Sequence, residues 1–179
     1  MIYLDNAATS YPKPPKVVQA MAGTLQKLGG NPGRAGHRLS LCGGRVIQNC
    51  RELLAQAFGA PAPENVIFTA SCTEALNVAI RGTLHEGDEV LCSHGEHNAV
   101  MRVLKGLEQE GAVRVTPLNP NSLGLITPDS IRQAITPKTA LCVLCHASNV
   151  TGVVQPVREL SQAVKPFGIP LLVDAAQTA

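Results

Sequence analysis

The chain has 179 residues, of which 45% are hydrophobic and 16% charged, which is enough length and apolar content for one domain with a core. These values exclude a disordered chain, and a net charge of +2 is too balanced to indicate a nucleic-acid partner or a membrane surface. No apolar run approaches the ~20 residues of a membrane span, and the opening MIYLDN has neither the basic nor the long apolar region of a signal peptide.

The first third of the chain is predicted to be mainly helical. Apolar side chains recur at helical spacing between Pro15 and Leu28 and again before Gly59, and glycines follow both segments. We expect helices over residues 14–28 and 40–58, a loop over 31–37 and a short strand over 66–69.

After this part, helices and strands alternate along the sequence. The predicted elements are a helix over 72–82, a strand over 89–92, a helix over 97–110, a strand over 113–115, a helix over 128–135, a strand over 140–145, a helix over 156–165 and a strand over 169–173. This alternation indicates an α/β fold with a mostly parallel sheet flanked by helices. Ligands of such sheets bind at the carboxyl ends of the strands, so the residues that follow each strand are the candidates for a site.

The segment after the first predicted strand opens a helix with small and hydroxyl residues. The free backbone N–H groups at such a helix start suit a phosphate group, and the Thr73 hydroxyl would be an additional donor. Local sequence also fits a capping box in which Ser71 is the N-cap and Glu74 the third helical residue. The two interpretations are compatible.

Polar side chains also follow the predicted strands over 89–92 and 140–145. His97 begins a helix, where the helix dipole disfavours a charged imidazole, so a neutral ring could stack on a planar ligand. Asn149 follows the strand over 140–145 and can both donate and accept a hydrogen bond. The alternatives are a solvent-facing histidine and an ordinary turn residue before Gly152.

The last predicted strand leads directly into Asp174, with Gln177 three residues later. A carboxylate at the end of an apolar strand is costly unless it is paired, and a protonated ring nitrogen is one natural partner. The alternative is an N-cap for a helix that starts at Ala175. Taken together, the strand ends offer what is needed to hold a phosphorylated, protonated pyridine.

These residues occur within a set of motifs that resembles a known family. The motifs are YLDNAAT (3–9), NPGRAGHRLS (31–40), TEALNVAI (73–80), EHNAV (96–100), SNVTGVVQP (148–156) and VDAAQTA (173–179). Their order resembles the N-terminal part of class V aminotransferase-fold enzymes, and within them the cysteine desulfurase and selenocysteine lyase group. The resemblance implies pyridoxal 5'-phosphate as cofactor and a fold type I large-domain portion.

The resemblance also implies how the cofactor would be held. Thr73 and the helix behind it would bind the phosphate, with Cys72 beside them. His97 would stack on the ring, Asp174 would pair with the protonated ring nitrogen, and Gln177 would donate to the phenolic oxygen.

The same resemblance implies a substrate side of the site. Asn149 would lie near the phenolic oxygen and the substrate carboxylate. The backbone of Ala7 and Ala8 would border the substrate, and His37 would lie near the mouth of the site. We expect residues 1–30 to form an N-terminal segment with a helix, and 31–179 to form part of the cofactor-binding large domain.

The resemblance implies three further family residues, including an arginine for the substrate carboxylate, that have no match in this sequence. The Schiff-base lysine and the nucleophilic cysteine belong to motifs downstream of the Asp-x-x-Gln segment, and no lysine here lies in a family motif (Lys13, Lys16, Lys27, Lys105, Lys138 and Lys165). We therefore expect the 179 residues by themselves to be inactive. The parent reaction implied is conversion of L-cysteine to L-alanine plus enzyme-bound sulfur. The alternatives are a selenocysteine lyase, another class V aminotransferase, or a non-catalytic truncated homologue that serves as a binding module.

The expected surroundings follow from the cysteines and from the family. Six cysteines in a chain of this size indicate free thiols and a cytoplasmic location. The family implies an amino-acid substrate, a homodimer and a possible sulfur-acceptor protein.

The sequence agrees less well with two other classes of site. Cys92, His94 and His97, or Cys142, Cys145 and His146, could supply zinc ligands, but strand alternation directs Cys142 and Cys145 to opposite faces, so no metal is expected. No dinucleotide or P-loop glycine motif is present.

Overall fold

The structure is a computed structural model that describes residues 2–34 and 36–179, and the chain divides between Phe68 and Thr69 into two compact units. The first unit contains helix α1 (Pro15–Lys27), helix α2 (Arg38–Phe58) and the short 3-10 helix η1 (Pro63–Asn65). The predicted domain division at residues 30 and 31 stays a prediction.

Both long helices of the first unit lie close to their predicted bounds. Pro15 stands at the first position of α1, where its missing N–H costs nothing. Helix α2 begins two residues earlier than predicted because Nδ1 of His37 accepts a hydrogen bond from the backbone of Ser40 at 3.3 Å. It ends at Gly59, which has the positive φ of 66° that favours glycine.

The predicted strand over residues 66–69 is wrong. Val66 has extended dihedrals (φ −95°, ψ 115°), but no part of this segment pairs with another strand among the described residues. Apolar composition makes a segment suitable for a sheet, whereas strand formation requires a hydrogen-bonded neighbour.

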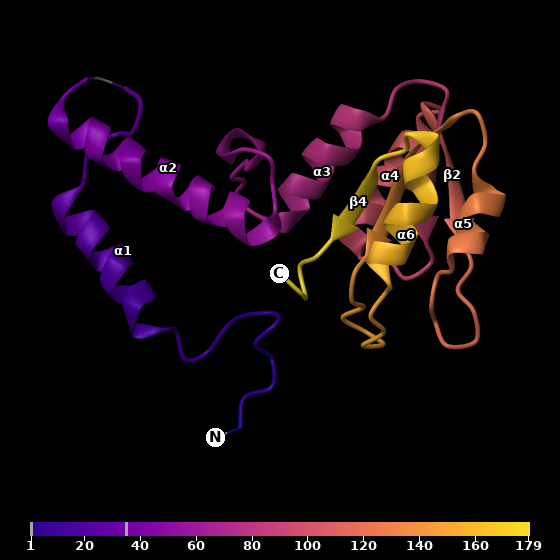
Figure 1. The fold of residues 1–179 in the computed structure, drawn as a ribbon, viewed down its shortest axis with the longest axis horizontal. Helices are drawn as coiled ribbons and strands as arrows, with labels where there is room; N and C mark the ends of the chain where they lie inside the picture. Colours follow the sequence, from indigo (N-terminus) through magenta and orange to yellow (C-terminus); the bar gives the residue numbers. More distant parts are fainter. Residues whose placement is uncertain (1, 35) are drawn as a thin grey trace. The chain divides into compact units, whose positions relative to one another are not determined.

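The second unit alternates helices and strands as predicted (Figure 1). Its elements are α3 (Cys72–Thr83), β1 (Asp88–Ser93), α4 (Asn98–Gln109), β2 (Val113–Leu118), α5 (Pro128–Ala134), β3 (Thr139–Cys145), α6 (Val157–Val164), η2 (Lys165–Phe167) and β4 (Leu171–Asp174). The four strands form one parallel sheet in the order β2-β1-β3-β4, which confirms the predicted α/β fold. All four carboxyl ends consequently lie at one edge of the sheet.

Helices cover both faces of this sheet, and the strand residues alternate between them. On one face Val90, Leu141 and Val143 pack with buried residues of α3 and α4. On the other face Leu91 and Leu144 pack with α5 and α6, which lie together on one side of the sheet in Figure 1. Each such side chain contributes roughly 1.5–3 kcal/mol when fully buried, so the central strands hold the unit together.

The amino end of the sheet contains a buried carboxylate, Glu89, whose side chain is only 5% exposed. Its oxygens accept hydrogen bonds from the hydroxyls of Thr116 at 2.6 Å, Thr139 at 3.1 Å and Thr136, and Arg114 lies 3.7 Å away. Burial acts to raise the pKa of Glu89, but the three hydroxyls and Arg114 outweigh it and lower that pKa. This glutamate is therefore a satisfied structural anion.

Within the described residues, no helix combines the length and the apolarity that crossing a membrane would require. All six cysteines are free thiols, as predicted.

Candidate cofactor site

The carboxyl edge of the sheet gathers the residues predicted to form the site. Asp174 is the last residue of β4 and pairs across the sheet with Cys145, the last residue of β3. The backbone N–H of His146 donates to the Asp174 carbonyl at 2.9 Å, which extends the ladder one step beyond the strands. Asp174 is thus fixed by the sheet itself.

The carboxylate of Asp174 is buried, with 4% exposure, and its hydrogen bonds to the described residues all involve one oxygen. Oδ1 accepts from the backbone N–H of Ala176 at 3.0 Å and from the Cys72 thiol at 3.6 Å. No basic side chain pairs with this carboxylate in the described part of the chain. The bond from Ala176 shows that Asp174 caps the turn after β4, and Oδ2 is left for another donor.

The start of α3 lies beside this carboxylate. Ser71 caps the helix, because its hydroxyl accepts from the backbone N–H of Glu74 at 3.2 Å. The Glu74 side chain accepts from the backbone N–H of Ala70 at 2.7 Å rather than from that of Ser71, so only the Ser71 half of the predicted capping box is formed. The N–H groups of Cys72 and Thr73 precede the first intrahelical bond and are free for a ligand.

His97 is the N-cap of α4. Its Nδ1 accepts a hydrogen bond from the backbone N–H of Ala99 at 3.1 Å, which requires that Nδ1 carry no proton. The bond fixes one edge of the imidazole and leaves the face of the ring available for stacking. The cap and the predicted stacking role are therefore compatible in this histidine.

Asn149 stands on a loop between β3 and α6 that folds back on itself. Ala147 and Val154 form an antiparallel bridge, and the N–H of Gln155 donates to the carbonyl of His146 at 2.7 Å. Gln177 lies in the turn after β4, which is held by the 2.8 Å bond between Nδ1 of His146 and the hydroxyl of Thr178.

A cavity of about 120 Å³ joins these segments. Its walls include six residues predicted to hold the cofactor, namely Cys72, Thr73, His97, Asn149, Asp174 and Gln177. We call this cavity the cofactor pocket. His37, Ala7 and Ala8 belong to the first unit, where His37 caps α2 and the two alanines lie in the turn closed by Thr9 and Asp5. Their proposed places beside the substrate stay predictions.

The two thiols of the cofactor pocket remain protonated. Partial burial, the charge of Asp174 and the hydrogen bond to it raise the pKa of Cys72. Burial, followed by the charges of Glu96 and Asp174, raises the pKa of Cys145 to about 11. Cys72 is therefore a donor to Asp174 and lacks the lowered pKa of a nucleophilic cysteine.

No group of three or more His, Cys, Asp or Glu side chains comes together in the described residues as a metal site would require. Cys142 packs with α5 and α6, on the face opposite Leu141 and Val143.

Comparison with known proteins identifies the family. The sequence matches the family described as aminotransferase class V over residues 2–179. The chain belongs to the class V aminotransferase family.

Relatives and solved structures of this family agree with the fold. A probable cysteine desulfurase of Vibrio cholerae is 33% identical over 181 residues, which is 99% of this chain and 45% of the relative. The cysteine desulfurase IscS of Vibrio vulnificus is 35% identical over 184 residues, with the same coverage. The structure titled SspA in complex with cysteine has a TM-score of 0.87 at 31% identity, covering 96% of this chain and 50% of that one. The chain thus spans about half the length of the proteins it matches.

Local sequence did not single out Glu96, whose side chain contacts two residues that line the cavities at the carboxyl end of the sheet. Its Oε1 accepts from the Ser93 hydroxyl at 2.5 Å and from the backbone N–H of Cys145 at 2.7 Å. Its Oε2 is buried and has no hydrogen-bond partner among the described residues. The available signal was its place between the end of β1 and His97. A glutamate in a loop is expected to be solvated. Glu96 is buried because it contacts Cys145, which lies 49 residues away in the sequence, and local sequence does not indicate that contact.

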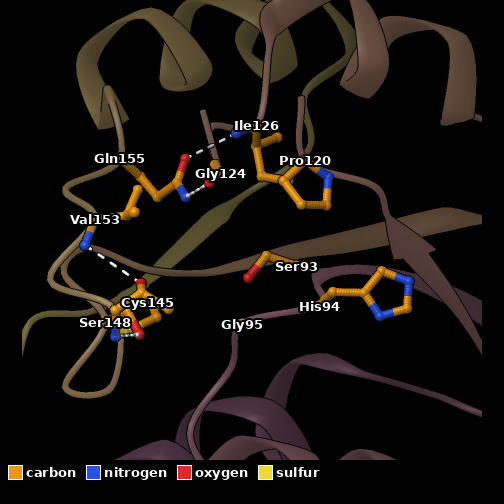
Figure 2. A pocket seen from close by; sticks show the side chains of 11 residues that line it. Ser93, His94, Gly95, Pro120, Gly124, Ile126, Cys145, Ser148, Val153 and Gln155 are labelled. Carbon is orange, nitrogen blue, oxygen red and sulfur yellow. Dashed lines mark hydrogen bonds between the residues drawn. The ribbon is translucent and has the colours of Figure 1, made fainter. Parts of the chain in front are cut away.

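A second cavity, of about 240 Å³, lies beside the cofactor pocket and shares Cys145 with it. Figure 2 shows the Gln155 amide reaching the opposite loop, where it accepts from the backbone of Ile126 and donates to Gly124, both at 2.9 Å. Ser148 accepts from the N–H of Thr151 at 3.2 Å. Gln155 and Ser148 of this second cavity therefore form hydrogen bonds within the chain, and Gln155 braces the loop that carries Asn149.

Proposed function

We propose that this chain forms the pyridoxal 5'-phosphate-holding part of a cysteine desulfurase. The observation that carries the proposal is the cofactor pocket, where a helix start, a helix-capping histidine and a buried carboxylate without a basic partner in the described residues meet. The names of its relatives support desulfuration, since they are called cysteine desulfurases, and one solved relative is described in complex with cysteine.

Each residue has a defined task in this proposal. The N–H groups of Cys72 and Thr73, with the Thr73 hydroxyl, bind the phosphate at the start of α3. His97 packs its ring face on the pyridine, and the Asp174 carboxylate accepts a hydrogen bond from the protonated ring nitrogen. When bound, the cofactor supplies an electron sink for bonds at the substrate α-carbon. Asp174 keeps that sink effective because its buried charge favours the protonated ring.

The remaining residues orient the ring and the substrate. Gln177 donates to the phenolic oxygen, and Asn149 lies near that oxygen and the substrate carboxylate. From the family resemblance alone, we propose that the backbone of Ala7 and Ala8 and the side chain of His37 also border the substrate. No lysine lines the cofactor pocket among the described residues, so we expect no sulfide release from the 179-residue chain above the background of free cofactor.

We also propose that the protein self-associates as a homodimer. The unpaired segment around Ile67, which is 74% exposed, supports this, as do the outer strands β2 and β4, each with a single neighbour in the described sheet. Light scattering coupled to gel filtration measures the mass, and a monomer at micromolar concentration would contradict the proposal. A sulfur-acceptor protein is proposed from the family alone.

Pyridoxamine 5'-phosphate is the suitable probe for the cofactor site, because it binds without a Schiff-base lysine. We expect the chain to bind it, and Asp174→Asn to weaken binding about 30- to 100-fold through loss of a charge-assisted hydrogen bond. Asp129→Asn, an 82% exposed aspartate on α5, is the matched control and should bind like the wild type. Calorimetric titration measures all three affinities, and equal affinity of the wild type and Asp174→Asn would contradict the proposal.

A further inference from the structure

Glu96 occupies the turn between β1 and α4, directly before His97. One oxygen of its carboxyl group joins the last residue of β1, Ser93, to the last residue of β3, Cys145. Cys145 in turn pairs with Asp174 at the end of β4. The Glu96 side chain therefore joins the ends of β1 and β3 directly, and the β3–β4 pairing continues this path to the end of β4. Ser93 lines the second cavity, and Cys145 lines both cavities.

The hydrogen bond to Cys145 falls where the sheet ladder stops. The β1–β3 pairing ends at Cys92 and Val143, so the N–H of Cys145 has no strand partner on that side. Glu96 supplies the acceptor and thereby continues the contact between the two strands beyond their last pair. The turn follows β1 along the chain, and the bond from Cys145 to Glu96 fixes it to β3 as well.

The position of His97 depends on that attachment. His97 follows Glu96 immediately, and its ring is held at one edge by the bond from Ala99 to Nδ1. The bond to Ala99 sets the orientation of the ring relative to α4. The bonds of Glu96 set the position of the helix start relative to β3 and Asp174, which the histidine cap cannot do alone.

We propose that Glu96 is a positioning residue of the cofactor pocket, fixing His97 relative to Asp174 through Ser93 and Cys145. This inference rests on the proposed function, because it assumes that a ring lies between His97 and Asp174. Glu96 touches neither the ring nor the substrate in this proposal and acts through the residues that it holds.

The charge of Glu96 gives this role a pH dependence. Burial raises the pKa of Glu96 to about 7, the hydrogen bonds from Ser93 and Cys145 oppose that rise, and Asp174 adds to it. The other titratable groups that interact with Glu96 are thiols of β1 and β3: burial raises the pKa of Cys92 and Cys142 to about 12 and that of Cys145 to about 11. These thiols stay neutral near pH 7, so Asp174 is the charge that matters.

A positively charged ring at Asp174 favours the ionised form of Glu96. Binding of the ring therefore lowers the pKa of Glu96, and by linkage an ionised Glu96 strengthens binding of the ring. The contribution of the charge is absent when Glu96 is protonated, below pH 6, and present above pH 8.

Two substitutions separate the hydrogen bonds from the charge. Glu96→Gln keeps an acceptor oxygen for Ser93 and Cys145 but cannot ionise. Glu96→Ala loses both properties. Glu110→Gln, an exposed residue at the end of α4, is the matched control.

The affinity of pyridoxamine 5'-phosphate is measured by calorimetry for the wild type and the three variants at pH 6 and pH 8.5. We expect Glu96→Gln to bind like the wild type at pH 6 and about 3- to 10-fold more weakly at pH 8.5. Glu96→Ala should bind about 10-fold or more weakly at both values, and Glu110→Gln should be unchanged. Titration of the probe itself is common to all four proteins and cancels in these ratios.

A second measurement reports on the ring of His97 without any ligand. In NMR spectra of the chain with 15N-labelled histidine, Glu96→Ala should shift the His97 ring signals, and Glu96→Gln should leave them near their wild-type positions at pH 6. If Glu96 had a purely structural role elsewhere in the fold, its replacement would not shift the ring signals of His97 in particular among those of the five histidines.

The outcomes distinguish this inference from the proposed function. If the wild type does not bind the probe, the proposed function is wrong. If the wild type binds and both Glu96 variants match it at both pH values, the role of Glu96 is wrong and the proposed function stands. If Glu96→Ala does not fold, the comparison of Glu96→Gln with the wild type at the two pH values decides the matter.

Discussion

The two ends of the sheet each hold a glutamate, and the two carboxyl groups are treated in opposite ways. Glu89 at the amino end accepts three threonine hydroxyls and lies beside Arg114, and its pKa is lowered. Glu96 at the carboxyl end has one hydrogen-bonded oxygen and one buried oxygen with no partner in the described part of the chain, and burial raises its pKa to about 7. The arrangement around Glu89 stabilises the fold, whereas Glu96 leaves a buried carboxylate oxygen without a hydrogen bond in the described residues, next to residues of the cofactor pocket. Perturbed and incompletely paired groups are typical of functional sites.

The largest expected effect comes from removing the satisfied carboxylate. Glu89→Ala leaves three threonine hydroxyls without their acceptor and Arg114 without its ionic partner. We therefore expect the free energy of unfolding to fall by about 2–4 kcal/mol. Urea denaturation at pH 7 measures the change. The folded fraction should bind pyridoxamine 5'-phosphate with wild-type affinity, because Glu89 lies at the opposite end of the sheet. A loss below about 0.5 kcal/mol would mean that the amino end is not the stabilising end.

Glu96→Gln should have a smaller effect on stability, with a different pH dependence. The pKa of Glu96 is raised on folding, so the folded chain binds the proton more tightly and loses stability as pH rises from 4.5 to about 7. The pKa of Glu89 is lowered, so its contribution is lost only as pH falls below about 4.5. We expect the stability of Glu96→Gln relative to the wild type to increase by about 1–3 kcal/mol between pH 5 and pH 8.

Denaturation curves at several pH values test this contrast. The stability difference between Glu96→Gln and the wild type should change across neutral pH, while the difference for Glu110→Gln should stay constant. A flat difference for Glu96→Gln would show that Glu96 ionises freely and that the two ends of the sheet are alike.

The smallest expected effect comes from the brace of the Asn149 loop. Gln155→Ala removes two hydrogen bonds, to Gly124 and Ile126, and should cost about 1 kcal/mol of stability. Because the loop carries Asn149 into the cofactor pocket, we expect affinity for pyridoxamine 5'-phosphate to fall about 3- to 10-fold. Gln155→Glu keeps an acceptor for Ile126 and should lose less. An unchanged affinity in both variants would show that the hydrogen bonds of Gln155 in the second cavity do not affect binding in the cofactor pocket.

Periodicity and strand-end chemistry predicted most of the second unit and the residues gathered in its pocket. That success has a physical reason, since parallel strands place their carboxyl ends at one edge whatever the details of packing. The segment 66–69 failed because a strand requires a partner that composition does not reveal. Glu96 was missed because its burial depends on contact with Cys145, which no local pattern encodes.

The two capping histidines show why local sequence does not identify a ligand-binding residue. His97 and His37 both cap helices through Nδ1, so capping alone does not mark a ligand residue. Only the neighbours of His97, brought together by the sheet, distinguish it. The roles of Asp174, Asn149 and Gln177 likewise depend on a pocket that joins turns far apart in the sequence.

The most direct test of the account concerns the ring nitrogen that Asp174 is proposed to hold. The chain is mixed with pyridoxamine 5'-phosphate labelled with 15N in the ring, at a pH where the ring nitrogen of the free probe is largely unprotonated. We expect the bound signal to lie in the pyridinium range in the wild type and to move to the range of neutral pyridine in Asp174→Asn. A bound probe with an unprotonated nitrogen in the wild type, or a pyridinium signal that persists in Asp174→Asn, would contradict the claim that the carboxyl end of the sheet is built around this carboxylate.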